Sequence, residues 1–297
     1  MRHHPLSDQQ SIVVMANPAA RNGRGAREAH TVSAALRGFG KEVREIRGTS
    51  VEESLDLAQQ AVSDGCDILV VIGGDGIVNV AVQALAGTDT ALGIVPTGTG
   101  NDAARGLGLP LGDVAEATNQ ILNGTRRSVD LARIDDRHYL TALAAGFDAA
   151  VAERANNMSW PKGQARYNLA ILAELRAFKP RHYRLTIDGE VLEQPGMLVA
   201  VANGPSFGGG IRIAHHAELD DGLLDVVVVD PVPKLELIKM TPKLRTGAIS
   251  EHPAYKVHRA TSVTIEAPDI VGYADGERFG PLPLTVECVP DALTVIA

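Results

Sequence analysis

The chain has 297 residues, of which 45% are hydrophobic, enough for two domains that each bury a core. Only 4% are aromatic and the net charge is -8, which argues against a stacking platform for single-stranded nucleic acid and against general polyanion binding. Cys66 and Cys288 are too few and too far apart for a disulfide scaffold or a zinc site. With no signal-peptide pattern and no run of about 18 apolar residues, we expect a cytoplasmic protein.

A strand followed by a small-residue loop is predicted near the start of the chain. Residues 11–16 form an apolar run that Asn17 and Pro18 end, and a helix is expected over residues 29–37. Asn17 and the loop around Gly23 would line a nucleotide pocket in the functional interpretation. An ordinary strand-to-helix connection explains the same spacing, and spacing alone favours it.

The next two predicted elements are a strand over residues 42–46 and a helix over residues 51–62. Thr49 and Ser50 precede this helix and are candidates for its N-terminal cap. Acidic residues in the first turn suit the helix dipole.

The stretch from Asp67 to Leu85 is typical of a buried strand, a glycine turn and a helix. The apolar run over residues 68–72 stops at Gly73-Gly74-Asp75-Gly76, and apolar residues then recur at helical spacing. Glycines let the backbone approach a ligand closely, and a helix start offers N–H groups to an anion, so a phosphate group is the expected ligand. A tight turn without any ligand is about as common for such glycines.

Asp75 favours a ligand-binding turn over a tight turn without a ligand. A carboxylate beside phosphates is unfavourable unless its charge is offset. A metal ion between the carboxylate and the phosphates would offset it. Alternatively, Asp75 orders the loop by accepting hydrogen bonds from backbone N–H groups. The first interpretation predicts a nucleotide with magnesium.

A second strand-to-helix junction follows the strand expected over residues 92–95. Its sequence, PTGTGNDAARGLGLP, has Gly98, Gly100 and Ala103 in the spacing of the dinucleotide fingerprint, a weak signal after the fourth strand of a sheet. Small polar side chains are more informative here: they are Thr97, Thr99, Asn101 and Asp102. Since neighbouring parallel strands end at one edge of a sheet, we expect the two junctions to lie together.

From about residue 125 the pattern changes to short strands separated by turns. Strands are expected over residues 128–134, 139–143, 183–187, 197–202, 223–229, 257–265 and 285–289, with a helix over residues 164–178 and a hairpin turn at Asp188-Gly189. The predicted fold is an α/β nucleotide-binding domain with a parallel sheet, residues 1–126, and a β-rich substrate domain, residues 127–297, which is a β-sandwich or a barrel. A return of the last residues to the first domain stays open.

Three places in the second half carry groups suited to chemistry. The glycine-rich loop over residues 207–210 suits ligand approach or a bulge. Asp221 lies among three carboxylates before an apolar strand and could bind magnesium or calcium, although a solvated turn explains the run equally well. Asp275 and Glu277 flank a glycine; phosphoryl transfer needs such acids, whereas a hairpin turn is the simpler interpretation.

Together these motifs resemble the diacylglycerol kinase catalytic family. The motifs are GGDG, PTGTGNDAARGLGLP, FGGGIRIA followed by DDGLLDV, and a late ADGE, and they span nearly the whole chain in order. More closely, the chain is similar to the bacterial lipid kinases of soluble type, which resemble sphingosine kinases. The resemblance implies ATP-dependent phosphorylation of a lipid hydroxyl within phospholipid metabolism, with the nucleotide bound between the two domains.

The resemblance also assigns roles to individual residues. Asp275 and Glu277 match the catalytic acids, and Asp221 with the carbonyls of Glu218 and Leu223 matches a structural magnesium site. By the resemblance, Thr49, residues 73–79 and Thr99 would contact ATP. With the polar and glycine residues singled out above in the loops, the full set expected to contact ATP is Asn17, Thr49, Gly73, Gly74, Asp75, Gly76, Asn79, Thr97, Gly98, Thr99, Asn101 and Asp102. In the expected mechanism Asp275, oriented by Glu277, accepts the proton of the attacking hydroxyl.

Three residues depart from the family pattern, which is usually GGDGT followed by Asn-Glu. Ile77 replaces the threonine, as an apolar residue also does in sphingosine kinases. Val80 replaces the glutamate and removes a carboxylate near the expected phosphates. His215 stands where proline is more frequent.

Other functions remain open on these residues. A kinase of a soluble acceptor, similar to NAD kinase, would share GGDG; an NAD-dependent oxidoreductase would rest on the weak fingerprint alone. A lipid-binding regulatory protein with a weakened site would explain Val80. We expect a lipid partner at a membrane surface, no nucleic acid, and leave a homodimer open.

Two basic segments are candidates for peripheral contact with the inner membrane face. Solvated helix faces explain each segment better when it is taken alone. The basic residues are Arg176, Lys179, Arg181 and Arg184 in the first segment and Lys234, Lys239, Lys243 and Arg245 in the second.

Overall fold

The protein was analysed as a computed structural model that describes residues 10–16, 24–146 and 179–297, together with single residues at 151, 154, 158, 160 and 169. The chain forms two compact units. Unit 1 comprises Met1–Leu131, Leu219–Gly222 and Val289–Ala297, and unit 2 comprises Ala132–Glu218 and Leu223–Cys288. The nucleotide contact expected at Asn17 and the helix expected over residues 164–178 lie outside the described residues, apart from residue 169 of that helix.

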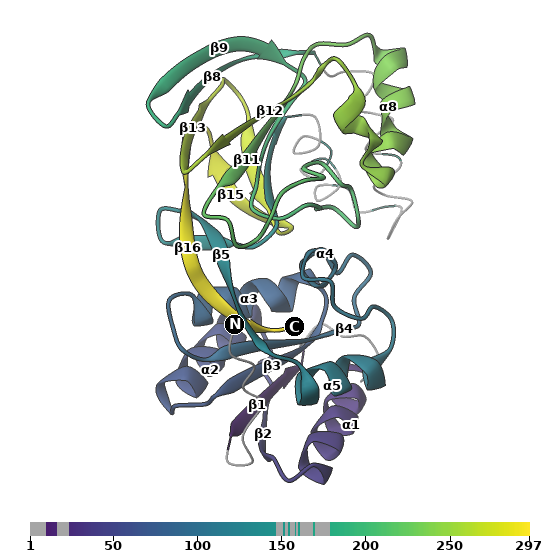
Figure 1. The fold of residues 1–297 in the computed structure, drawn as a ribbon, viewed down its shortest axis with the longest axis vertical. Helices are drawn as coiled ribbons and strands as arrows, with labels where there is room; N and C mark the ends of the chain where they lie inside the picture. The colour runs from purple at the N-terminus through teal and green to yellow at the C-terminus, as the bar shows by residue number, and fades with distance from the viewer. Residues whose placement is uncertain are drawn as a thin grey trace. The chain divides into compact units, whose positions relative to one another are not determined.

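Unit 1 is built on a parallel sheet, as predicted (Figure 1). Four strands are hydrogen-bonded in the order β2-β1-β3-β4, and residue 295 of the last strand, β16, pairs in parallel with β4. The strands are β1 (Ser11–Ala16), β2 (Glu42–Ile46), β3 (Ile68–Gly73), β4 (Ala91–Pro96) and β16 (Leu284–Ile296). Every residue of β3 and β4 is buried, which explains their unbroken apolar sequences.

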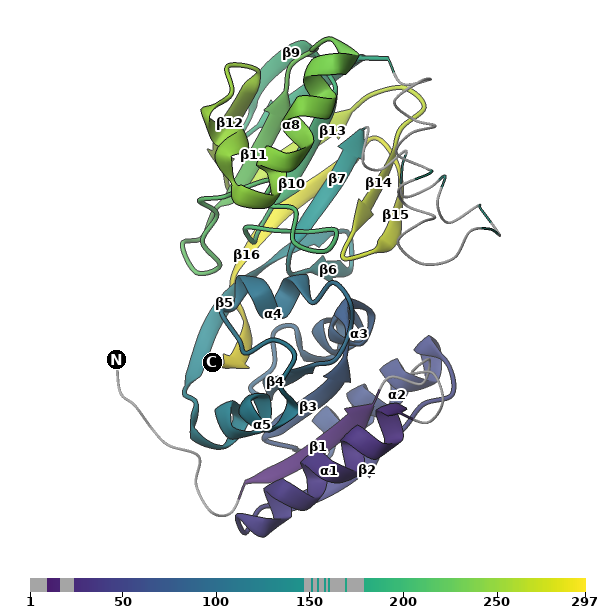
Figure 2. The ribbon, with the colours of Figure 1, turned by 90° about the vertical axis from the view of Figure 1, so that its right-hand side faces the viewer.

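Helices cover both faces of this sheet (Figure 2). On one face, α1 and α5 pack side by side and share a core with β1, β3 and β4. On the other face, α2 and α3 pack against each other and against β3. The helices of unit 1 are α1 (Arg24–Gly38), α2 (Val51–Ser63), α3 (Asp75–Leu85), α4 (Asp102–Gly106) and α5 (Val114–Asn123).

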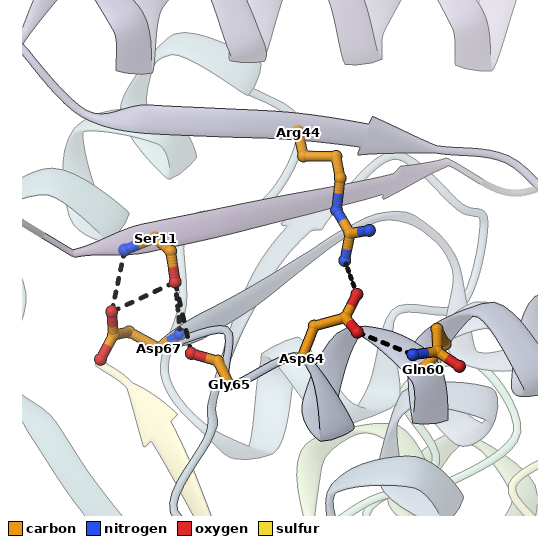
Figure 3. Close-up of polar contacts among 6 residues, drawn as sticks. All are labelled: Ser11, Arg44, Gln60, Asp64, Gly65 and Asp67. Carbon is orange, nitrogen blue, oxygen red and sulfur yellow. Dashed lines mark hydrogen bonds and ion pairs between the residues drawn. The ribbon is translucent and has the colours of Figure 1, made fainter.

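Polar contacts fix where the parallel strands begin (Figure 3). The backbone N–H of Ser11, at the start of β1, donates to the Asp67 carboxylate at 2.8 Å, and the Asp67 N–H donates to the Ser11 carbonyl at 3.0 Å. Arg44 in β2 forms an ion pair with Asp64 at 3.0 Å, just after α2. The hydrogen bond that Gln60 donates to Asp64 contributes most to lowering the pKa of that carboxyl group. These contacts set the register of β1 against β3.

Unit 2 is a β-sandwich, which confirms the second half of the predicted fold. One layer contains β13, β8 and β9 beside the first residues of β16; the other has the order β12-β11-β10-β7-β14-β15. The strands are β5 (Arg126–Ile134), β6 (Arg137–Tyr139), β7 (Ala142–Gly146), β8 (Arg181–Ile187), β9 (Glu190–Gly196), β10 (Leu198–Ala202), β11 (Leu224–Val229), β12 (Tyr255–Ala260), β13 (Ser262–Glu266), β14 (Val271–Ala274) and β15 (Glu277–Pro281), of which β5 begins in unit 1.

Alternating residues of the central strands fill two separate cores. Val199 and Val201 of β10 face the core between the two layers, whereas Ala200 and Ala202 face the opposite side. There they pack near Met240 of α8 (Lys234–Thr246), and the 3-10 turn η2 (Ala248–Glu251) belongs to the same cluster. None of the described helices is long and apolar enough to cross a lipid bilayer.

Two predicted strands are wrong because each is really a pair of strands. The run over residues 257–265 divides at Thr261 into β12 and β13, which lie in different layers. The hydroxyl of Thr261 and the N–H groups of Thr261 and Ser262 donate to Asp188, so a side chain from the β8–β9 hairpin holds the break. The run over residues 139–143 divides between β6 and β7. The predicted hairpin turn at Asp188-Gly189 is confirmed, with φ of 46° and 91°.

Three strands were not predicted, namely β9, β14 and β15. They are short and contain proline, glycine or charged residues in place of an apolar run. The strand expected over residues 285–289 is part of the 13-residue β16.

Asp130 of β5 attaches the two distant segments of the chain that belong to unit 1. Its carboxylate accepts hydrogen bonds from the Gly222 N–H at 2.7 Å and from the Asp291 N–H at 2.9 Å, and the side chain is 2% exposed. Nearby, Arg127 forms an exposed ion pair with Asp220 at 2.9 Å. Both side-chain contacts join β5 to the segment 219–222, but only Asp130 also reaches the C-terminal segment, and only Asp130 is buried.

We expect Asp130→Asn to lower the free energy of unfolding by about 2–4 kcal/mol, because one buried charge-assisted acceptor becomes a donor facing an N–H group. Urea denaturation followed by circular dichroism measures the change. Asp220→Asn is the matched control and should cost less than about 1 kcal/mol, as exposed ion pairs do. Equal costs for the two variants would contradict this account.

Candidate functional site

The two glycine turns of unit 1 touch each other at the carboxyl ends of β3 and β4. The N–H groups of Thr97 and Gly98 donate to the Gly73 carbonyl at 2.8 and 3.2 Å. A Cβ placed on Gly98 would lie 2.4 Å from the Gly74 Cα, closer than any side chain tolerates. Glycine is therefore required at residue 98 by the approach of the two backbones.

Asn101 closes the second turn on itself. Its side-chain oxygen accepts from the Gly98 N–H at 3.1 Å and its side-chain nitrogen donates to the Gly98 carbonyl at 3.0 Å. The residue has φ 54° and ψ 43°, a left-handed conformation that asparagine tolerates better than most residues. This ring of contacts gives the turn a fixed shape before any ligand arrives.

The Asp75 carboxylate accepts a hydrogen bond from the Ala103 N–H at 3.2 Å, at the start of α4. The Asn101 side chain does not cap α4, so Asp75 from the neighbouring turn takes that role. Of the two explanations offered for an acid in this turn, the ordering of backbone N–H groups is the one that the contact supports.

The start of α3 is open, in contrast to the start of α4. Gly74 supplies no side-chain cap, and Gly76 is exposed with empty space where a Cβ would project. An uncapped N-terminus of an 11-residue helix presents N–H groups and a partial positive charge. A phosphate group therefore fits these residues, because its oxygens would satisfy the open donors without meeting a side chain.

The other residues expected around the nucleotide differ in exposure. Thr99 is exposed and Thr97 half-buried, whereas Asp102 is buried. Asn79 lies on α3, 8% exposed, and its side-chain nitrogen has no hydrogen-bond partner among the described residues. Such an orphaned donor suits an acceptor supplied from outside the chain.

Thr49 is placed by its own helix. Its N–H and hydroxyl donate to the Glu53 carboxylate at 2.7 and 2.5 Å, and Ser50 accepts from the Glu53 N–H at 3.1 Å, which together cap α2. The hydrogen bond from the Thr49 hydroxyl is the main reason why the pKa of Glu53 is lowered. Within the described residues no hydrogen bond joins Thr49 to either glycine turn.

In unit 2 the expected catalytic acids lie on the β14–β15 hairpin. Asp275 and Gly276 form its two-residue turn with φ of 50° and 84°. The Asp275 carboxylate accepts from the Leu140 N–H at 2.9 Å, from the Thr141 N–H at 3.1 Å and from the Thr141 hydroxyl. Three donors suit an ionised carboxylate, which only accepts hydrogen bonds. Glu277, the first residue of β15, is exposed.

The connector between β6 and β7 is itself held in place by hydrogen bonds that no sequence motif indicates. Asn203 donates from its side chain to the Leu140 carbonyl at 3.0 Å and from its N–H to the Thr141 carbonyl at 2.9 Å. Tyr139 is fully buried and donates to the Val201 carbonyl, and burial raises the pKa of its hydroxyl well above the ordinary value. Leu140, Thr141 and Asn203 are thus functional candidates that only the fold reveals.

The proposed metal ligands occupy the segment before β11. Glu218 is exposed, while Asp221 and Leu223 are half-buried. In the part of the chain that the structure describes, no three His, Cys, Asp or Glu side chains lie close enough together to hold a metal ion. The proposed set needs only one carboxylate and two carbonyls, so it stays a prediction. Asp225, two residues further on, is buried, and burial raises the pKa of its carboxyl group.

Comparison with known proteins agrees with both halves of this arrangement. The diacylglycerol kinase catalytic domain matches residues 11–134, and the YegS C-terminal NAD kinase beta sandwich-like domain matches residues 141–297. The diacylglycerol kinase of Mycobacterium tuberculosis (strain ATCC 25618 / H37Rv) is 38% identical over 302 residues, covering 100% of this chain and 97% of that protein. This chain belongs to the diacylglycerol kinase family.

Relatives at greater distance share the same architecture. The diacylglycerol kinase of Bacillus subtilis (strain 168) is 28% identical over 240 residues, or 79% of each chain. A crystal structure described as a diacylglycerol kinase from Bacillus anthracis str. Sterne has a TM-score of 0.75 at 23% identity and covers 97% of this chain and 96% of its own. That likeness shows the fold, and membership of the family makes this chain a lipid-kinase-type phosphotransferase at the level of the family.

The contact between the glycine turns predicts opposite effects for two glycine substitutions. Gly98→Ala should lower the free energy of unfolding by about 1–3 kcal/mol, because its Cβ forces the two turns apart. Gly76→Ala, the control in the same site, should be neutral or stabilising by up to about 1 kcal/mol, since nothing opposes its Cβ and alanine favours a helix. Chemical denaturation of both variants tests this; a tolerated Gly98→Ala would show that the turns do not touch.

Proposed function

We propose that this protein transfers the γ-phosphate of ATP to the hydroxyl of a lipid, a diacylglycerol or a sphingoid-like base. The observation that carries the proposal is the open N-terminus of α3 beside the Gly74–Gly98 contact. The first N–H groups of α3 are donors that suit a phosphate group. The chain is also 38% identical, over its whole length, to a diacylglycerol kinase.

The residues proposed to hold the nucleotide act mainly through the backbone. The sequence has no GxxxxGK[ST] motif, so no P-loop lysine neutralises the phosphates. The N–H groups of the first turn of α3, such as that of Gly76, would bind them, and Asn79 would supply a side-chain donor. Magnesium, when bound, would supply further neutralisation, and a structural ion would be held by Asp221 with the carbonyls of Glu218 and Leu223.

Asp275 is proposed as the group that accepts the proton of the substrate hydroxyl. The hydroxyl oxygen forms a bond to the γ-phosphorus while the bond from that phosphorus to the bridging oxygen of ADP breaks. Glu277 is proposed to assist in orienting Asp275. The hydrogen bonds from Leu140 and Thr141 support the proposal, because a general base must be held in a fixed position.

Two other functions are kept as alternatives. A kinase of a soluble acceptor would use the same glycine turns. A weakly active lipid-binding protein is favoured by Ile77 and Val80, because their apolar side chains, 3% and 6% exposed, supply no polar group to the site.

The proposed activity is tested by incubating the protein with labelled ATP and magnesium and a panel of acceptors: diacylglycerol, a sphingoid base, total lipid extract and NAD. We expect label in one lipid and a loss of at least about 100-fold in Asp275→Asn, as expected for removal of a general base. Circular dichroism and nucleotide binding control for the fold of the variant.

Each other outcome selects a different function. Label in NAD alone would assign a soluble acceptor. Lipid binding without any turnover would assign a regulatory protein. Turnover that Asp275→Asn leaves unchanged would remove Asp275 from the mechanism.

A lipid acceptor requires a surface of the protein that contacts the bilayer. The two basic segments differ in whether their charged side chains already form ion pairs. Arg184 forms ion pairs with Glu193 at 3.4 Å and Glu266 at 3.6 Å, so its charge is already compensated. On α8, Lys239 lies 3.9 Å from Glu236, whereas Lys243 and Arg245 are exposed and have no ion pair among the described residues. Arg176 of the first segment lies outside the described residues. We therefore propose that α8 is the segment in peripheral contact with anionic lipid.

Flotation with vesicles containing anionic phospholipid tests this surface. The triple variant Lys239→Gln, Lys243→Gln, Arg245→Gln should lose binding by about 10-fold or more, since each cation near the surface contributes about 1 kcal/mol. The triple variant Arg47→Gln, Lys179→Gln, Arg181→Gln removes the same amount of charge, including two residues of the first basic segment, and should bind normally. Equal losses in the two variants would show that α8 is not the docking segment, and wild-type protein that stays entirely unbound would exclude the surface.

A further inference from the structure

We propose that Thr141 is a positioning residue for the proposed phosphoryl transfer: its hydroxyl fixes the carboxylate of Asp275 in the orientation that the reaction uses. The inference rests on the proposed function, and it concerns a residue that carries no sequence motif.

The contact between Thr141 and Asp275 is not one that the hairpin turn requires. An Asp-Gly turn between two strands is stabilised by its own backbone conformation. Here the Asp275 side chain instead reaches residues 134 and 135 positions earlier in the sequence. The Thr141 hydroxyl and N–H donate to one carboxylate oxygen, and the Leu140 N–H donates to the other. Both oxygens are thus held from one side.

The connector that carries these donors is rigid. The Thr141 carbonyl accepts from the N–H groups of Asn203 at 2.9 Å and Gly204 at 2.8 Å. The Leu140 carbonyl accepts from the Asn203 side chain at 3.0 Å. Thr141 is 5% exposed and Asn203 is fully buried, so any movement of the connector would break hydrogen bonds that water cannot replace.

The hairpin is held on its other strand as well. Arg137 of β6 donates to the Arg278 carbonyl at 2.9 Å, and its guanidinium lies 4.0 Å from the centre of the Phe279 ring. Phe279 in turn packs edge-on against Tyr139, with ring centres 5.9 Å apart. Both strands of the hairpin are therefore fixed to the segment from β6 to β7. The Asp275 side chain can then move only by rotating about its own torsion angles, and the hydrogen bonds from Thr141 restrict that rotation.

Thr141→Val isolates the hydroxyl. Valine keeps the shape and the backbone N–H donors, so the fold is retained, but one donor to the carboxylate is lost. We expect kcat to fall about 10- to 100-fold, the effect of a slightly misplaced catalytic group, while KM for ATP and for the lipid change less than about 2-fold. Thr141→Ser restores the donor and should restore kcat to within about 3-fold of wild type.

Thr118→Val is the matched control. Thr118 is likewise a buried threonine with a hydrogen-bonded hydroxyl, but its hydroxyl donates to a backbone carbonyl, that of Val114 at 2.6 Å in α5. The substitution should leave kcat unchanged. If Thr141→Val and Thr118→Val lower kcat equally, or if serine does not rescue, Thr141 has only a structural role and the proposal is wrong.

Amide hydrogen exchange provides a second measurement that needs no lipid. Asp275→Asn should raise the exchange rate of the Leu140 or the Thr141 amide at least about 10-fold, because asparagine keeps only one of the two oxygens that accept from these N–H groups. Unchanged exchange would show that the carboxylate does not hold these donors and would overturn the proposal alone. Absence of phosphate transfer by the wild-type protein to every acceptor would overturn the proposed function and this inference together.

Discussion

The backbone contact between Gly74 and Gly98 is the constraint on which the organisation of unit 1 depends. Two parallel strands bring their turns to the same edge of the sheet, and the turns can touch only because neither residue has a side chain. The contact fixes where α3 begins and leaves its first N–H groups open. It also places Asp75 where its carboxylate caps α4. A bulkier pair of turns would separate these two helix starts and remove the set of donors that suits a phosphate.

Unit 1 was largely predictable because its strands and helices are defined by local patterns. The apolar run over residues 68–72 is short and rich in β-branched residues, which favours a buried strand over a helix, and the glycines after it mark the turn. The errors in unit 2 occur where a distant side chain decides the backbone. Residues 257–265 read as one strand, but Asp188 binds Thr261 from 73 positions away and divides it. No local pattern contains that information.

The candidate site likewise contains residues that local motifs reveal and residues that only the fold reveals. The glycine turns and the Asp275 hairpin are visible as motifs because their residue types reflect local conformation, including φ values that favour glycine and aspartate. Thr141 and Asn203 are ordinary residues in the sequence, and they matter only because the sandwich brings β7, β10 and β14 side by side. A motif therefore identifies the acid, whereas the fold identifies what holds it.

The burial of Ile77 and Val80 bears on how the phosphate charge is met in this chain. Both side chains are nearly inaccessible, so a carboxylate at residue 80 in this backbone would need a buried partner to remain ionised. The only carboxylate of the first turn, Asp75, already accepts a hydrogen bond from α4. The open groups that remain around α3 are donors: the first N–H groups of the helix and the side-chain nitrogen of Asn79. Electrostatically, the donors of this turn suit the direct binding of an anion, and with valine at residue 80 the turn carries one negative charge fewer than the family pattern.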